Sequence, residues 1–107
     1  MKYEDQDLII GAVLKKYRNE KGLSIRQAGE RFKIDNSTVS SWEIGKNSIT
    51  AKELFKYLEF LGHSQDDFYR DYKICENKVL QSIKQPFEDD EKRTKLRRIL
   101  ADLMEAK

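Results

Sequence analysis

The chain has 107 residues, 38% hydrophobic and 37% charged, which indicates a polar, soluble protein of one domain or of a small domain with an appendage. One cysteine excludes an intramolecular disulfide and a cysteine-based metal cluster. No run approaches the roughly 20 apolar residues that span a bilayer, so we expect a cytoplasmic protein without membrane contact. A net charge of +2 is low for a nucleic-acid-binding protein, so only the placement of individual charges can argue for such binding.

A first helix is predicted over residues 7–21, because apolar residues recur there at the spacing of a helix face. The residues of this face are Leu8, Ile9, Ala12, Val13 and Tyr17. Gly22 follows at the position where helices often end in the left-handed conformation.

Ser24 and Gln27 have the spacing of a capping box, which predicts a second, short helix over residues 25–32. The apolar residues that this helix would turn inward are Ile25, Ala28 and Phe32.

A third helix is predicted over residues 36–44, directly after the polar segment 33–36 breaks the pattern of the second. Either Asp35 or Asn36 can cap it. Its buried residues are Val39 and Trp42. Two short helices joined by a tight turn are the usual arrangement for reading the major groove of DNA, although the pattern alone also occurs in other helical proteins.

Three further helices are predicted, over residues 51–61, 65–84 and 88–106, and no strand pattern occurs, so the expected fold class is all-α. The last helix carries a wide apolar stripe, made of Leu96, Ile99, Leu100, Leu103 and Met104. This stripe either folds back onto the preceding helices or contacts a second copy of the chain. We expect the second arrangement, a homodimer, because two copies can read two half-sites on DNA.

Three runs of residues lie around the two short helices: Gly22-Leu23-Ser24, Ala28-Gly29-Glu30-Arg31-Phe32 and Ser37-Thr38-Val39-Ser40-Ser41-Trp42-Glu43-Ile44-Gly45-Lys46. Together they closely resemble the lambda-repressor/Cro-like helix-turn-helix family, also called the XRE family. The resemblance covers residues 8–68. It implies a lambda-repressor-like DNA-binding domain of four to five helices in residues 1–63, followed by a C-terminal helical extension, expected to dimerise, in residues 64–107.

The resemblance also implies roles for single residues of the third helix. The residues expected to contact bases are Asn36, Ser37, Thr38 and Ser41. They are short and polar, and asparagine can pair with adenine through two hydrogen bonds. The residues expected to contact phosphates are Arg26, Lys46 and Asn47. Arg18 and Glu43 resemble a buried ion pair of the family that fixes the third helix without touching DNA.

The departures from the family pattern are Ile25, the pair Ala28-Gly29, Lys33 and Ile44. Lys33 stands where a turn glycine is usual, so we expect a strained or altered turn. Ile44 stands where asparagine or arginine is more usual, which removes one polar group from the edge that faces phosphates.

The function expected from these residues is that of a sequence-specific transcriptional regulator, foremost a repressor, that binds an inverted repeat in double-stranded DNA as a dimer and that a protein or peptide can regulate. The alternative is an antitoxin or anti-repressor whose helical tail binds a partner protein. We expect no enzyme, cofactor or metal site. His63 is the one histidine, expected in a surface loop, and Cys75 lies on an apolar helix face, where a core position is expected.

Overall fold

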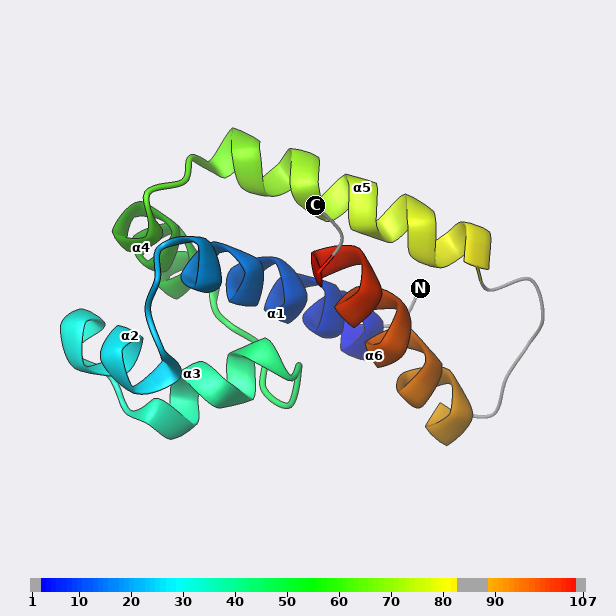
Figure 1. Cartoon of the computed structure of the whole chain (residues 1–107), viewed down its shortest axis with the longest axis horizontal. Helices are drawn as coiled ribbons and strands as arrows, with labels where there is room; N and C mark the ends of the chain where they lie inside the picture. Colours follow the sequence, from blue (N-terminus) through cyan, green and yellow to red (C-terminus); the bar gives the residue numbers. More distant parts are fainter. Residues whose placement is uncertain (1–2, 83–88, 106–107) are drawn as a thin grey trace.

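Six helices account for the regular structure in the part of the chain that the computed structural model describes, residues 3–82 and 89–105 (Figure 1). In chain order they are α1 (Tyr3–Glu20), α2 (Ile25–Phe32), α3 (Asn36–Glu43), α4 (Ala51–Leu61), α5 (Gln65–Ser82) and α6 (Asp89–Glu105). No strand occurs within these two ranges, so the expected all-α fold class is confirmed. None of the helices described there is long and apolar enough to cross a membrane.

The starts of α2 and α4 follow the capping signals in the sequence. The Ser24 hydroxyl accepts a hydrogen bond from the Gln27 amide at 3.0 Å, and the Gln27 side chain accepts one from the Ser24 amide at 2.9 Å. Thr50 and Glu53 form the same reciprocal pair at the start of α4. Such boxes satisfy amide groups that have no partner within the helix, and both helices have the bounds that were predicted.

The turn between α2 and α3 passes through the left-handed conformation at Lys33, where φ is 64° and ψ is 46°. Among the described residues, Lys33 is the only one other than glycine with a positive φ. This conformation brings the Cβ atom close to the backbone and costs about 1 kcal/mol or more for an L side chain. The turn therefore keeps the backbone shape that glycine would adopt, and the lysine carries the strain.

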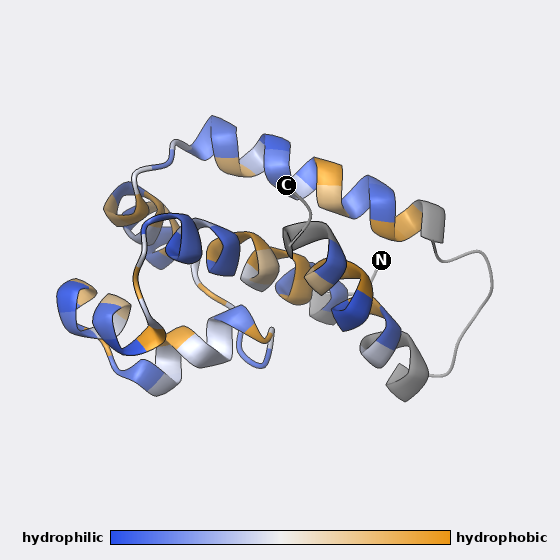
Figure 2. Cartoon of the chain, in the orientation of Figure 1, coloured by the Kyte–Doolittle hydropathy of each residue, from blue (hydrophilic) through white to orange (hydrophobic). Residues whose placement is uncertain are grey.

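α1 lies in the middle of the molecule and contacts α3, α4, α5 and α6 (Figure 1). All residues of its predicted stripe are buried, and Leu14 on the adjacent side is buried as well. In Figure 2 hydrophobic residues recur along α1, α4 and α5, whereas α2 is mostly hydrophilic and much of α3 has intermediate hydropathy. Because apolar residues occupy much of the circumference of α1, this helix needs neighbours on several sides.

The C-terminal helices supply some of these neighbours. Cys75 and Val79 of α5, with Leu96 and Leu100 of α6, belong to the same buried cluster as the apolar residues of α1. The hydrophobic core therefore includes residues from both sides of the boundary predicted between residues 63 and 64.

This packing buries within the chain part of the α6 stripe that was expected to be a dimer contact. Only 1% of Leu96 and 4% of Leu100 is exposed, and Ile99 packs against the same cluster. Leu96 and Leu100 cover a side of α1 that the first four helices leave open. Because α1 and α5 already pack against these two residues, they offer no surface to a second chain. The side chains of Leu103 and Met104 lie outside the described part of the structure.

Replacing Leu96 by alanine should lower the free energy of unfolding by about 2–5 kcal/mol, because the truncated side chain leaves a cavity beside α1. Arg98→Ala, on the exposed side of the same helix, is the matched control and should change it by less than about 0.5 kcal/mol. Chemical denaturation followed by circular dichroism, at two protein concentrations, measures both variants. A Leu96→Ala protein that keeps its stability and loses only self-association would show instead that Leu96 contacts a second copy of the chain.

Candidate nucleic-acid interface

α2 and α3 approach each other closely at Gly29. A Cβ atom on Gly29 would lie 2.9 Å from the carbonyl oxygen of Ile34 and 2.7 Å from the Asn36 Oδ1 atom. The Ile34 amide also donates a hydrogen bond to the Gly29 carbonyl at 2.9 Å. Any side chain at this position would push the two helices apart, so glycine here sets the separation of α2 and α3.

α3 turns one side to the core and the other to solvent. Val39 and Trp42 are buried, as predicted. Of the residues expected to contact bases, Asn36 and Ser37 are exposed, and Thr38 and Ser41 are half-buried. At 100° per residue Ser37 and Ser41 lie on the side of the helix that faces away from Val39 and Trp42, whereas Asn36 and Thr38 lie nearer to these two buried residues. The side of α3 that faces away from the core therefore carries Ser37 and Ser41, with Asn36 exposed at the start of the helix.

The residues expected to contact phosphates are all exposed: Arg26, Lys46 and Asn47. Arg26 lies near the start of α2 and pairs with Glu30, its Nε atom 3.1 Å from the Glu30 Oε1 atom. Both side chains are more than half exposed, so water and salt weaken this pair. Lys46 and Asn47 lie in the turn after α3, where their amides donate to the carbonyl of Ser41.

A buried ion pair joins α1 to the end of α3. The Arg18 guanidinium donates from Nε to the Glu43 Oε2 atom at 2.6 Å and from Nη2 to the Oε1 atom at 2.9 Å. A third hydrogen bond, from Nη1, reaches the carbonyl of Leu23 at 2.7 Å. Hydrogen bonding to Glu43 raises the pKa of Arg18 although burial alone would lower it. The pair therefore ties α1, the loop before α2 and α3 together.

Gly11 lies in the middle of α1, beneath the C-terminal end of α3. A Cβ atom there would clash with the carbonyl oxygens of Trp42 and Glu43, both of them backbone atoms that cannot turn aside. Sequence reasoning did not single out this residue. Its signal is a lone glycine inside a helical pattern, where glycine costs stability unless packing requires it.

Aromatic rings support α2 and α3 from the side of α4. The ring of Tyr57 lies 5.0 Å from Phe32 and 5.5 Å from Trp42, and Phe32 lies 5.3 Å from Phe60. The Tyr57 hydroxyl is buried and has no hydrogen-bond partner among the described residues. Burial raises its pKa to about 12, which keeps it neutral in any ordinary buffer.

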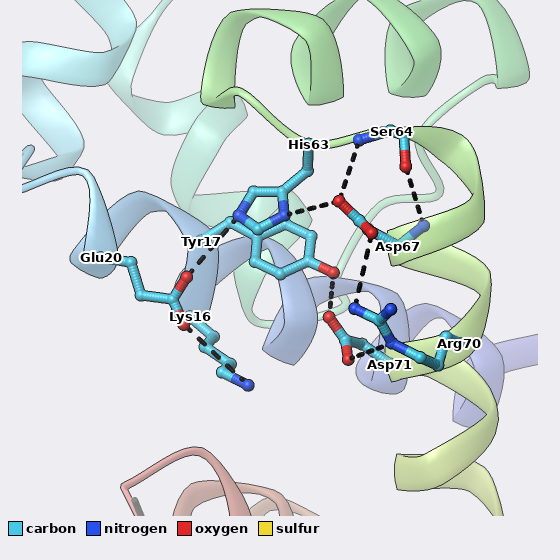
Figure 3. A network of polar contacts seen from close by, with 8 residues as sticks. All are labelled: Lys16, Tyr17, Glu20, His63, Ser64, Asp67, Arg70 and Asp71. Atoms are coloured by element: carbon cyan, nitrogen blue, oxygen red, sulfur yellow. Dashed lines mark hydrogen bonds and ion pairs between the residues drawn. The ribbon is translucent and has the colours of Figure 1, made fainter.

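His63 lies in the loop between α4 and α5, as expected, but it is half-buried, with 24% of its side chain exposed. Its ring stacks on Tyr17 at 3.5 Å between Glu20 and Asp67, each with one oxygen 3.6 Å from an imidazole nitrogen (Figure 3). The Tyr17 hydroxyl donates to Asp71, and burial together with this bond holds the pKa of Tyr17 above its usual range. The network joins α1 to the start of α5.

The described residues contain no group of three or more His, Cys, Asp and Glu side chains placed to hold a metal ion. Cys75 is buried in the core, as predicted, and burial raises the pKa of its thiol, which disfavours the reactive thiolate.

One comparison with known proteins gave a match. Residues 14–66 match a family described as helix-turn-helix, a segment that contains α2, α3, α4 and the turns between them. Neither the curated proteins nor the solved structures gave a match to the chain.

Gly11→Ala should lower the free energy of unfolding by about 1–3 kcal/mol, because the added methyl group pushes the end of α3 away from α1. The direction of the change is informative, since replacing glycine by alanine at an open helix position would raise the free energy of unfolding by about 1 kcal/mol. Asn19→Ala, on the exposed side of α1, is the control. Thermal unfolding measures both variants, and a higher melting temperature for Gly11→Ala would contradict the close approach of the two helices.

Glu43→Ala should lower the free energy of unfolding by about 3–5 kcal/mol, because it leaves the Arg18 charge buried without its partner. The control is Glu30→Ala, which breaks an exposed pair and should cost no more than about 1 kcal/mol. The double variant Arg18→Leu with Glu43→Leu should lose less than Glu43→Ala, since no charge stays buried. Denaturant titration compares them, and equal losses for Glu43→Ala and Glu30→Ala would show that the pair contributes no more than a surface pair.

Proposed function

Residues 14–66 belong to the helix-turn-helix family of DNA-binding transcriptional regulators of the Cro/C1 type, and from this premise we propose that the chain is a repressor that reads an inverted-repeat operator as a homodimer. The observation that carries the proposal is the polar outer surface of α3, held rigidly on α1 by the Arg18–Glu43 pair.

The polar surface of α3 has the chemistry for reading base edges. Asn36, at the start of the helix, is exposed and can donate to and accept from one adenine at the same time. Ser37, Thr38 and Ser41 carry hydroxyl groups that reach several base edges, and the Thr38 methyl group suits the methyl group of thymine. Short side chains let the helix backbone lie close to the floor of the groove.

The phosphate contacts position α3 over the bases. Lys46 and Asn47 lie at its C-terminal end and Arg26 at the start of α2, so the three would grip the DNA backbone on either side of the groove. Arg26 exchanges Glu30 for a phosphate on binding, which is easy because the pair is exposed.

A homodimer is part of the proposal because α3 is only 8 residues long and reaches few base pairs by itself. With Leu96 and Leu100 covered inside the chain, the contact between copies has to use another surface. Tyr69, Ile74 and Leu80 of α5 are large, apolar and about half exposed or more, and they are the side chains that we assign to it. Repression then needs nothing more than occupancy of the operator.

Selection from random duplex DNA should enrich an inverted repeat whose half-sites are about one helical turn apart. Affinity for the enriched duplex should fall steeply with salt, because each neutralised phosphate releases a counterion. Sedimentation of the free protein gives its oligomeric state. Selection that enriches no motif would contradict sequence-specific binding, and enrichment of a single half-site by a sedimenting monomer would contradict the homodimer alone.

Two variants separate the assigned roles within this experiment. Asn36→Ala with Ser37→Ala should relax the base preference, and each side chain that pairs well with a base should cost about 1–3 kcal/mol of discrimination when it is removed. Lys46→Ala is the matched control, which should weaken binding to all sequences about equally and reduce the salt dependence by about one counterion. The reverse pattern, with Lys46 controlling base preference, would overturn the assignment.

A further inference from the structure

A pocket of about 390 Å³ opens between α1, α6 and the end of α3. Its apolar lining comes from all three elements: Leu8, Ala12, Ile44, Leu100 and Ala101. Its size falls in the range of roughly 300–1,000 Å³ that small-molecule sites occupy. Ile44 is the large apolar residue of this set that is most open to solvent, with 47% exposed, and nothing in DNA binding explains an apolar side chain there.

The charged groups around the pocket that are available to a ligand are positive. Lys15, Lys16 and Arg97 line it, and Glu43 is the only acidic residue among the described residues of the lining. Both carboxylate oxygens of Glu43 are already engaged by Arg18. Lys16 makes a loose exposed pair with Glu20 at 4.0 Å, and no ion pair links Lys15 or Arg97 to another described residue. An apolar floor with a cationic rim is complementary to an amphipathic anion.

We propose that this pocket binds a small molecule with an apolar chain and a carboxylate, and that its binding weakens the grip of α3 on DNA. Glu43 and Ile44, the end of α3, form one wall, so the ligand contacts the same element that carries the base-reading surface. The ligand also brings a negative charge beside the segment from which Lys46 reaches a phosphate. By reciprocity, DNA must weaken ligand binding by the same factor. The coupling rests on the proposed function, whereas the pocket's affinity for the anion does not.

The test uses the full chain and decanoate as the probe, titrated by calorimetry in the absence of DNA. Decanoate should bind, and decyltrimethylammonium, with the same chain and the opposite charge, should not. Arg97→Glu should weaken decanoate binding about tenfold or more. Arg98→Glu, on the neighbouring exposed residue outside the pocket lining, is the matched control and should leave it unchanged. Ala101→Trp, at an exposed position that needs no repacking of the core, should fill the pocket and abolish binding.

A second measurement tests the coupling, by anisotropy of the selected duplex with and without saturating decanoate. Decanoate should weaken operator binding by about fivefold or more for the wild type, and not for Ala101→Trp. Equal binding of the cationic probe, or decanoate binding that survives both Arg97→Glu and Ala101→Trp, overturns the site. Decanoate binding with unchanged operator affinity overturns the coupling. If no operator can be selected, the proposed function fails, and the calorimetry still decides the site.

Discussion

The attachment of the C-terminal end of α3 to α1 is the constraint on which the rest of this structure depends. α3 has 8 residues, and a helix of that length is barely stable in water without packing. Two features hold its end: the pair of hydrogen bonds between Arg18 and Glu43, and the close backbone approach that the missing side chain of Gly11 permits. With only one of these contacts, α3 could tilt about it. Together the two contacts fix the direction in which its polar surface points.

α1 serves both halves of the molecule because it is apolar around much of its circumference. One side supports α3, and the others are covered by α4, α5 and α6. The helices after residue 64 are therefore part of the same core as the helix-turn-helix segment, through residues such as Val79 and Leu96. α6 and α3 both pack on α1, so a shift of α6 can move α3 through this one helix. The pocket beside Leu100 and Ile44 is lined by residues of the same three elements.

The low net charge of +2 is consistent with this design. Affinity for DNA grows with the number of phosphates neutralised, whereas discrimination between sequences comes from hydrogen bonds at base edges. The surface of α3 is made of an amide and three hydroxyl side chains, with cations only at its borders, at Arg26 and Lys46. Lys33 adds a cation in the turn between the two helices, at a cost in backbone strain that a glycine would avoid.

How much of this could be predicted from the sequence depends on how local each feature is. The capping box at Ser24 and the apolar spacing of α1 involve residues three or four apart, and they located the start of α2 and the buried face of α1 because the interactions that start and bury a helix act over that distance. The start of the first helix was predicted wrongly, because α1 begins at Tyr3 and not at residue 7. The polar side of α3 followed from the same periodicity. The pair between Arg18 and Glu43 could be named only through the resemblance, since a separation of 25 residues leaves no local pattern.

What the tertiary structure alone decided is which surfaces meet. The stripe of α6 is amphipathic in the same way whether it packs on its own chain or on a second one, so the sequence could not choose, and the answer came from the open side of α1 that α6 covers. The same holds for Gly11 and His63. A glycine and a histidine look ordinary in the sequence, and their roles exist only because α3 crosses one and Tyr17 stacks on the other. The sequence by itself determined that the chain is helical, the bounds of α2 and α4, and the apolar face of α1, because those properties are local. Which apolar face lies on which was settled by three-dimensional packing, because burial depends on all the surfaces present at once.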